Sequence, residues 1–268
     1  MPRPTVPVVM TFAGNDPTGG AGLQADIEAI DSMGGQAAPV VTALTVQDTR
    51  DVIRVEPVEA ALVVEQARAV LEDMPVAAFK IGLVGDIANA EAIHTILTDY
   101  PHIPVVLDPI LRAGGGTELA DRPLCDALLE LLFPLATLAV PNSREARALA
   151  PGADTLDACA QALLATGCEF VLVTGSHEAT AAVDNTLYGN MRRLETFSWD
   201  RLPQSFHGSG CTLASAIAGL LAQGLEPFTA VHEAQEYTWE SLSRGYRLGM
   251  GQHHPNRLFW ARDDEASE

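Results

Sequence analysis

The sequence predicts an α/β fold in three layers, with a mostly parallel central sheet covered by helices on both faces. The chain has 268 residues, 47% of them hydrophobic, which is enough for a substantial core. Short β-branched apolar runs alternate with segments of helical periodicity through most of the sequence. Such apolar strands are typical of a parallel sheet buried between helices. We expect one domain over residues 1–268, with a frayed tail over residues 254–268.

The expected elements follow one another along the chain, each strand marked by a short apolar run. Strands are expected at residues 6–12, 39–46, 77–83, 105–108, 138–140 and 170–174. Helices are expected at about residues 21–33, 58–71, 88–98, 211–223 and 228–244. The pattern changes over residues 181–199, which predict a small β-hairpin that turns at Gly189-Asn190.

The charge and cysteine content exclude several function classes. The formal net charge is −19, so a basic stripe for nucleic acid or anionic lipid is not expected. No run approaches the roughly 18 apolar residues of a membrane span, and the first residues lack a signal-peptide pattern. The four cysteines form no CxxC pair and have no metal-like spacing, as is typical of reduced thiols. We therefore expect a soluble cytoplasmic protein.

The most informative stretch is Gly208-Ser209-Gly210-Cys211, which lies directly before an alanine-rich helical run. Small residues let the backbone approach a ligand closely, and the first amides of a helix have no acceptor within it. Together with the helix dipole, these amides favour a phosphate or a developing oxyanion. Cys211 at the mouth of this site is expected to have a lowered pKa. The alternative is a glycine-containing turn before a packed helix.

Polar residues follow the carboxyl ends of the expected strands, where ligands collect in doubly wound sheets. These residues are Gly14 to Gly22 with Asp26 after them, then Gln47, Asp108, Asn142 and Glu145. Each has an ordinary structural alternative: Asp26 as a solvated helix residue, Gln47 as a loop residue, and Asp108 as a turn residue before proline. Asn142 and Glu145 also have the spacing of a capping box. Their joint placement favours a ligand site.

Six segments resemble the hydroxymethylpyrimidine and phosphomethylpyrimidine kinases of thiamin biosynthesis, which have a ribokinase-like fold. The segments are residues 13–26, 42–47, 80–83, 106–109, 141–145 and 207–212, within a resemblance that covers about residues 6–250. The first and the last segments are specific, and the others are supportive. The resemblance implies ATP-dependent phosphorylation of the hydroxymethyl group of 4-amino-5-hydroxymethyl-2-methylpyrimidine, and it leaves open phosphorylation of the monophosphate. It also implies Mg²⁺ and a homodimer.

The resemblance divides the site residues by role. The pyrimidine is contacted by Gly14, Asp26, Gln47, Leu83 and Ile110. Gly208, Ser209 and Gly210 supply the anion hole, and Cys211 is the expected base, where many sugar kinases of this fold carry an aspartate. The ATP contacts fall to Asn142, Thr174, Ser176, Gly208 and Gly210, while Asp108 and Glu145 hold Mg²⁺ and its waters.

The chain departs from this family pattern in two places. Many members carry Lys-Gly-Gly-His where this chain has Thr174-Gly175-Ser176-His177, and many have a lysine near Gln235. Losing two lysines weakens phosphate neutralisation, for which Arg144 or Mg²⁺ would compensate. Two alternatives therefore stay open. One is a pyridoxine or pyridoxal kinase, whose substrate is also a methylated heteroaromatic ring with a hydroxymethyl arm. The other is a non-catalytic pyrimidine-binding protein.

Overall fold

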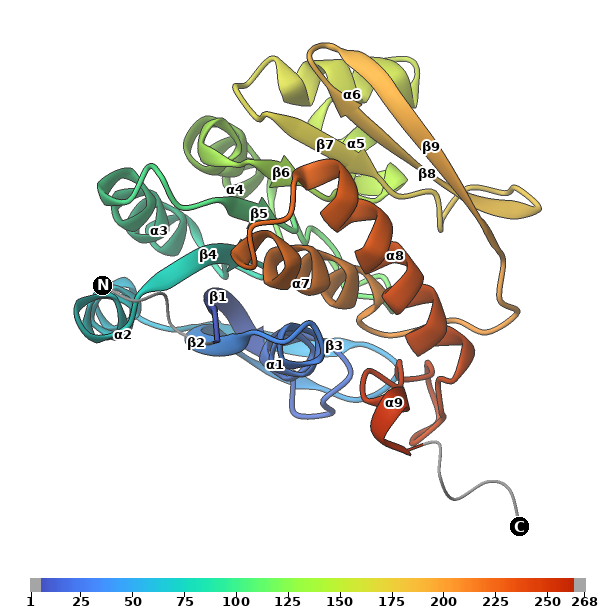
Figure 1. Cartoon of the computed structure of the whole chain (residues 1–268), viewed down its shortest axis with the longest axis horizontal. Helices are drawn as coiled ribbons and strands as arrows, with labels where there is room; N and C mark the ends of the chain where they lie inside the picture. The colour runs from blue at the N-terminus through green and yellow to red at the C-terminus, as the bar shows by residue number, and fades with distance from the viewer. Residues whose placement is uncertain (1–5, 263–268) are drawn as a thin grey trace.

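One sheet forms the middle layer of this computed structural model, which describes residues 6–262 (Figure 1). Within these residues the sheet has nine strands in the order β3-β2-β1-β4-β5-β6-β7-β8-β9. The strands are β1 (Val8–Asn15), β2 (Gln36–Gln47), β3 (Val52–Pro57), β4 (Val76–Ile81), β5 (Val105–Leu107), β6 (Leu138–Ala139), β7 (Phe170–Val173), β8 (Ala182–Gly189) and β9 (Arg192–Asp200).

Six neighbouring strands of the sheet pair in parallel, in the order β2-β1-β4-β5-β6-β7. The expected mostly parallel sheet is therefore confirmed. The other strands are antiparallel and lie at the two edges: β3 pairs with β2, and β8 and β9 continue from β7. Strand β3 was not expected. The β8–β9 hairpin turns one residue later than expected, because the residues of its turn, Asn190 and Met191, both have positive φ.

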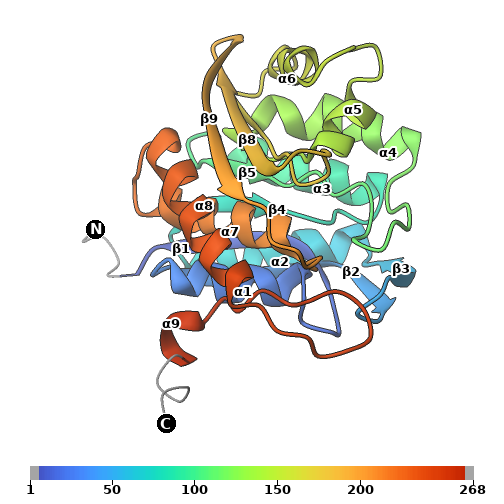
Figure 2. The same cartoon turned by 90° about the vertical axis from the view of Figure 1, so that its right-hand side faces the viewer.

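Helices cover both faces of the sheet (Figures 1 and 2). Those that share a hydrophobic cluster on one face are α1 (Gly22–Ser32), α7 (Ser209–Ala222) and α8 (Pro227–Ser243). Those on the other face are α2 (Ala60–Asp73), α3 (Ile87–Asp99), α4 (Arg122–Ala127), α5 (Ser143–Leu149) and α6 (Leu156–Leu164). A π-helical turn η1 (Leu128–Leu132) and a 3₁₀ turn η2 (Phe133–Leu135) follow α4, and α9 spans Phe259–Arg262.

The hydrophobic core forms two separate clusters, one on each face of the sheet, because successive side chains of a strand point to opposite faces. In β1, Met10 and Phe12 belong to the cluster under α2 and α3, whereas Val9 belongs to the cluster under α7. Helix α7 is buried almost throughout, and its alanines let it lie close to the sheet between α1 and α8. None of the helices in residues 6–262 is both long and apolar enough to span a membrane.

The segment after α8 does not fray within the described residues. It runs back past α1 to α9 (Figure 2). Arg257 and His254 are only 2% and 3% exposed, and the hydroxyls of Tyr237 and Ser32 both donate to the Arg257 carbonyl. The expected frayed tail is therefore wrong for residues 254–262, because the buried Arg257 anchors them. Residues 263–268 lie outside the described part.

The burial of α7 gives a stability prediction. Ile217→Ala should lower the free energy of unfolding by about 2–5 kcal/mol, because Ile217 is 0% exposed and the cavity left behind stays empty. The matched control Ile87→Ala, at a site that is 39% exposed, should lose less than about 1 kcal/mol. Urea unfolding of both variants measures the difference. Equal losses would mean that α7 is not packed as described.

Candidate active site

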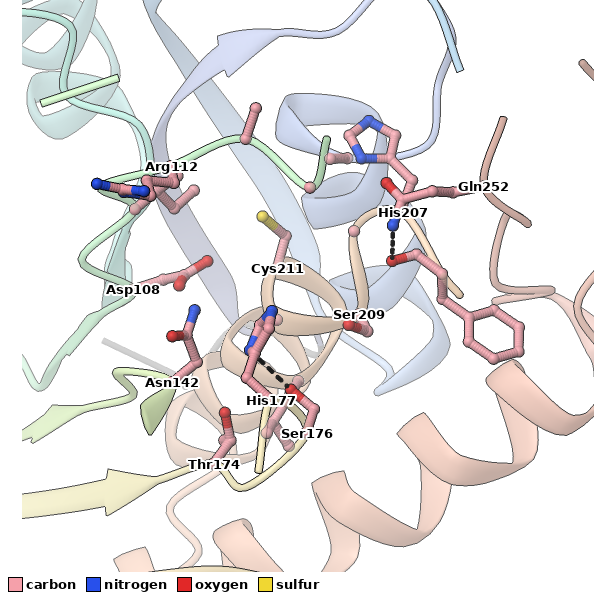
Figure 3. A pocket seen from close by; sticks show the side chains of 18 of the residues that line it. Asp108, Arg112, Asn142, Thr174, Ser176, His177, His207, Ser209, Cys211 and Gln252 are labelled. Carbon is pink, nitrogen blue, oxygen red and sulfur yellow. Dashed lines mark hydrogen bonds between the residues drawn. The ribbon is translucent and has the colours of Figure 1, made fainter. Parts of the chain in front are cut away.

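A cavity of about 670 Å³ opens where the parallel strands end and helix α7 begins. Figure 3 shows side chains from several loops and from the start of α7 pointing into it, among them Asp108, Asn142, Ser209 and Cys211. All the site residues expected from the sequence, except Asp26, line its wall. They are Gly14, Gln47, Leu83, Asp108, Ile110, Asn142, Glu145, Thr174, Ser176 and the run Gly208–Cys211.

The first turn of α7 faces this cavity because Gly208, directly before the helix, lets the backbone lie against the backbone of Gly20. Gly208 has a φ of 83° and precedes the helix as its N-cap. A Cβ atom at this position would lie 1.9 Å from the carbonyl oxygen of Gly20, so no other residue fits. The amides of Ser209, Gly210 and Cys211 thus begin the helix at the cavity wall, where helix geometry favours an anion.

Cys211 lies deeper than the sequence suggested, and its expected lowered pKa is wrong for this structure. The residue is 5% exposed. Burial raises the pKa of the thiol, and the nearby Asp108 carboxylate raises it further, while the Lys80 ammonium acts in the opposite direction. The loss of hydration therefore outweighs the helix N-terminus, and the resting group is a neutral thiol.

The carboxylate of Asp108 lies beside the start of α7. Its Oδ1 lies 3.9 Å from the place that a Cβ on Gly210 would occupy. Its Oδ2 is buried and has no hydrogen-bond partner among the described residues. Burial raises the pKa of Asp108, although Lys80 partly offsets this rise. An unpartnered buried carboxylate oxygen at a cavity wall is poised to take a cation or a proton.

Asn142 and Glu145 form a capping box at the start of α5, as their spacing allowed. The Asn142 side chain accepts from the Glu145 amide at 3.0 Å, and the Glu145 Oε2 accepts from the Asn142 amide at 2.9 Å. The Glu145 Oε1 also accepts from the amide of Leu111 at 3.4 Å. Burial, followed by the charge of Asp108, raises the pKa of Glu145 to about 8. The capping role is thus confirmed at a residue that also lines the cavity.

Asp26 lies behind the cavity rather than in its wall, contrary to the expected pyrimidine contact. Its carboxylate accepts hydrogen bonds from the Thr11 hydroxyl at 2.5 Å, the Ser215 hydroxyl at 2.6 Å and the Lys80 ammonium at 2.8 Å. The side chains of Asp26 and Lys80 are both 0% exposed. Although burial alone would lower it, the Asp26 charge raises the pKa of Lys80, which stays an ammonium. Each oxygen of Asp26 therefore already accepts from a donor within the protein, and the side chain does not reach the cavity wall.

Sequence reasoning missed a partly buried pair between Asp16 and His207, both of which line the cavity. The His207 Nε2 lies 2.8 Å from the Asp16 Oδ2. Burial would raise the pKa of Asp16, yet the His207 contact and the amides of Thr18 and Ala21 hold it at about 2. The sequence signal for this pair was the position of His207 directly before Gly208. A residue at that position has to lie close to the glycine-rich loop that follows β1.

Gln235 lies in the cavity wall, where the resemblance implied a lysine nearby. Its Oε1 accepts from the Asn185 side chain at 2.9 Å and from the Trp199 indole at 3.1 Å. Thr174 also lines the cavity, as do the cationic side chains Arg112, Arg144 and Arg201. Among these, Arg201 donates to the carbonyls of Ser176, Glu178, Thr180 and Ala182 and fixes their loop. Cations other than lysine thus border the cavity.

No group of three or more histidine, cysteine, aspartate or glutamate side chains within residues 6–262 could hold a metal ion. Mg²⁺ in phosphoryl-transfer sites typically binds through one or two carboxylates, water and the substrate. The free oxygen of Asp108 fits this mode of binding, whereas both oxygens of Glu145 already accept backbone hydrogen bonds.

The parallel sheet, the cavity at its strand ends and the glycine-rich start of α7 define a ribokinase-like α/β protein. The sequence model described as phosphomethylpyrimidine kinase matches residues 16–256, and the chain belongs to this family.

Two curated relatives and one solved structure are similar to the chain. The hydroxymethylpyrimidine/phosphomethylpyrimidine kinase of Rhizobium meliloti is 37% identical over 96% of this chain and 99% of its own length. The thiamine biosynthesis bifunctional protein ThiED of Geobacter sulfurreducens is 37% identical over 95% of this chain, which spans only 53% of that relative. The ADP complex of Bacillus subtilis pyridoxal kinase is 25% identical, with a TM-score of 0.88 over 97% of this chain and 100% of its own.

The Asp26–Lys80 pair gives a prediction that separates its structural role from ligand binding. Asp26→Asn should lower the free energy of unfolding by about 3–5 kcal/mol, because it leaves a buried ammonium without its counter-charge. The control Asp99→Asn breaks the exposed Arg68–Asp99 pair and should cost less than about 1 kcal/mol. Urea unfolding compares the two. A stable Asp26→Asn variant with weakened pyrimidine binding would restore the original ligand role.

Proposed function

We propose that this chain is an ATP-dependent kinase that phosphorylates the hydroxymethyl group of 4-amino-5-hydroxymethyl-2-methylpyrimidine, and then the monophosphate that results. The observation that carries the proposal is the start of α7, which opens onto the same cavity as Gln47 and Asp108. A helix N-terminus built from glycine and serine suits a phosphate, and an amide side chain suits the edge of a heteroaromatic ring. The family and the name of the Rhizobium relative support this assignment.

The pyrimidine would lie among Gly14, Gln47, Leu83 and Ile110, which line one part of the cavity. A Cβ on Gly14 would lie 3.0 Å from the Leu83 side chain, so a larger residue there would crowd the apolar wall. The half-buried Gln47 can both donate to and accept from ring nitrogens and an amino group. A ring with a different polar edge would leave that amide unpaired, which is how this site would discriminate.

The triphosphate would lie between the start of α7 and the residues Asn142, Thr174 and Ser176, with Arg144 nearby. The proposal assigns Mg²⁺ to Asp108 directly and to Glu145 through water, since only Asp108 has a free oxygen. When bound, Mg²⁺ neutralises phosphate charge that would otherwise repel Asp108 and Glu145. The α7 amides would stabilise the charge on the phosphoryl group as it transfers.

The alcohol must lose a proton as the phosphoryl group transfers, and Cys211 and Asp108 are the two candidate acceptors. The transition state is loose, so positioning supplies most of the catalysis and the proton acceptor acts late. Cys211 lies at the third residue of α7, directly at the anion hole. Its raised pKa makes the thiol a poor base at rest, and a cation bound beside it would lower that pKa and favour the thiolate. We keep Cys211 as the first choice.

We extend the proposal to a cytoplasmic homodimer. Leu44, Val46 and Ile53 are 52%, 45% and 74% exposed on β2 and β3, and a second copy would remove these side chains from water. The four cysteines, all within the described residues, are free thiols, as is usual in a reducing compartment. Sedimentation of the purified protein tests the dimer.

The function is tested by release of ADP from ATP and Mg²⁺ with the pyrimidine or with pyridoxal as acceptor. We expect a higher kcat/KM for the pyrimidine and no release without an acceptor. ADP release with pyridoxal alone would identify a pyridoxal kinase, the activity of the Bacillus relative. Calorimetric binding of the pyrimidine without any ADP release would identify a binding protein instead.

Cys211→Ala should lower kcat by about 10²–10⁴-fold, the range for loss of a general base, while pyrimidine binding persists. Cys125→Ala is the matched control, because Cys125 is buried in the core away from the cavity. Normal turnover in Cys211→Ala would make this cysteine a packing residue and leave Asp108 as the acceptor.

A further inference from the structure

Two glycine segments, far apart in sequence, meet at the start of α7. One is Gly19-Gly20, which follows β1, and the other is Gly208, the N-cap of α7. Their backbones are so close that any side chain on Gly208 would collide with the Gly20 carbonyl. The direction of the α7 amides therefore depends on how these two segments are held together.

The side chain of Arg257 contacts both segments at once. Its Nε donates to the Thr212 hydroxyl at 2.8 Å, and that hydroxyl donates to the Gly208 carbonyl at 2.8 Å. Its Nη2 donates to the Gly20 carbonyl, and its Nη1 donates to the Gly19 carbonyl at 3.4 Å. One guanidinium thus links the first turn of α7 to the glycine loop after β1.

The chemistry of this contact requires arginine. The planar guanidinium presents five N–H donors in a fixed fork, and here they reach acceptors in different directions. The side chain of Arg257 is 1% exposed, and its only charged partner among the described residues is Glu28, at 3.1 Å. A lysine has one point charge on a flexible stem and cannot reach the hydroxyl and both carbonyls together.

We propose that Arg257 is a positioning residue for phosphoryl transfer, which holds the first turn of α7 in register with the Gly19-Gly20 loop. The inference rests on the proposed function, because it assigns the α7 amides to the transferring phosphoryl group. Arg257 lies one residue beyond the segment that the family model matches. It touches neither cavity nor substrate, and it acts only through the backbone that it fixes.

A positioning role predicts a particular kinetic pattern. The α7 amides stabilise charge that is fully developed only in the transition state, so a small misplacement lowers kcat more than it alters binding. Arg257→Lys should therefore lower kcat about 10- to 100-fold, with both KM values within about threefold of wild type. Thr212→Val removes the same link from the α7 side and should show the same pattern. The double variant should be little worse than either single variant.

The control is Glu28→Gln, which removes the charged partner of Arg257 but keeps its contacts with Thr212, Gly19 and Gly20. This variant should lose stability while its kcat stays within about twofold of wild type. Circular dichroism and assays below the melting temperature keep unfolded protein out of the comparison. As a second arm, millimolar guanidinium should restore part of the kcat of Arg257→Ala and none of the kcat of Cys211→Ala.

Folded Arg257→Lys with wild-type kcat would overturn the inference. So would a kcat loss in Glu28→Gln as large as that in Arg257→Lys, because the effect would then follow stability alone. A wild-type chain that releases no ADP with the pyrimidine would instead contradict the proposed function. In that case, hydrogen exchange at the amides of residues 209–212 decides: faster exchange in Arg257→Lys supports the inference, and unchanged exchange rejects it.

Discussion

The carboxylate of Asp26 is the constraint on which the centre of this structure depends. From α1 it accepts hydrogen bonds from Thr11 on β1, Lys80 on β4 and Ser215 on α7, so four elements meet at one buried charge. Gly82 allows this arrangement, since a Cβ there would lie 2.6 Å from the Lys80 ammonium. The same ammonium acts on Cys211 and Asp108 at the cavity floor. The fold and the electrostatics of the site thus depend on a single ion pair.

The sequence predicted the parallel strands and the long helices, and missed the edge strand β3 and the shorter helices α4, α5 and α6. The parallel strands and the helices α1, α2, α3, α7 and α8 were all expected, because the strands lie within apolar runs and each of these helices extends over several turns. Helices α4 and α5 have only six and seven residues, too few for a period of 3.6 to emerge. Strand β3 carries Arg54 and Glu56 among its apolar residues, as an exposed edge strand can.

The sequence also predicted where the site lies but not how deeply its residues are buried. Strand ends converge at one edge of a parallel sheet, so the wall of the cavity follows from the order of the elements. Depth depends on packing between distant segments. Asp26 shares a helix face with Leu23 and Ile30, and this spacing indicates a position in the interior. Because aspartate is polar, Asp26 was expected at the ligand site instead. Cys211 was judged by its helix terminus alone, whereas the surrounding protein decides the protonation of its thiol.

The contact between Arg257 and Gly20 joins residues 237 positions apart, and that between His207 and Asp16 joins residues 191 apart. Contacts of such long range close large loops, which slows folding and exposes partly folded chains. During synthesis, β1 and its glycine loop leave the ribosome long before α7 and Arg257 exist. The anion-binding end of α7 therefore matures late, and a nascent chain that already holds its strands has no finished phosphate site.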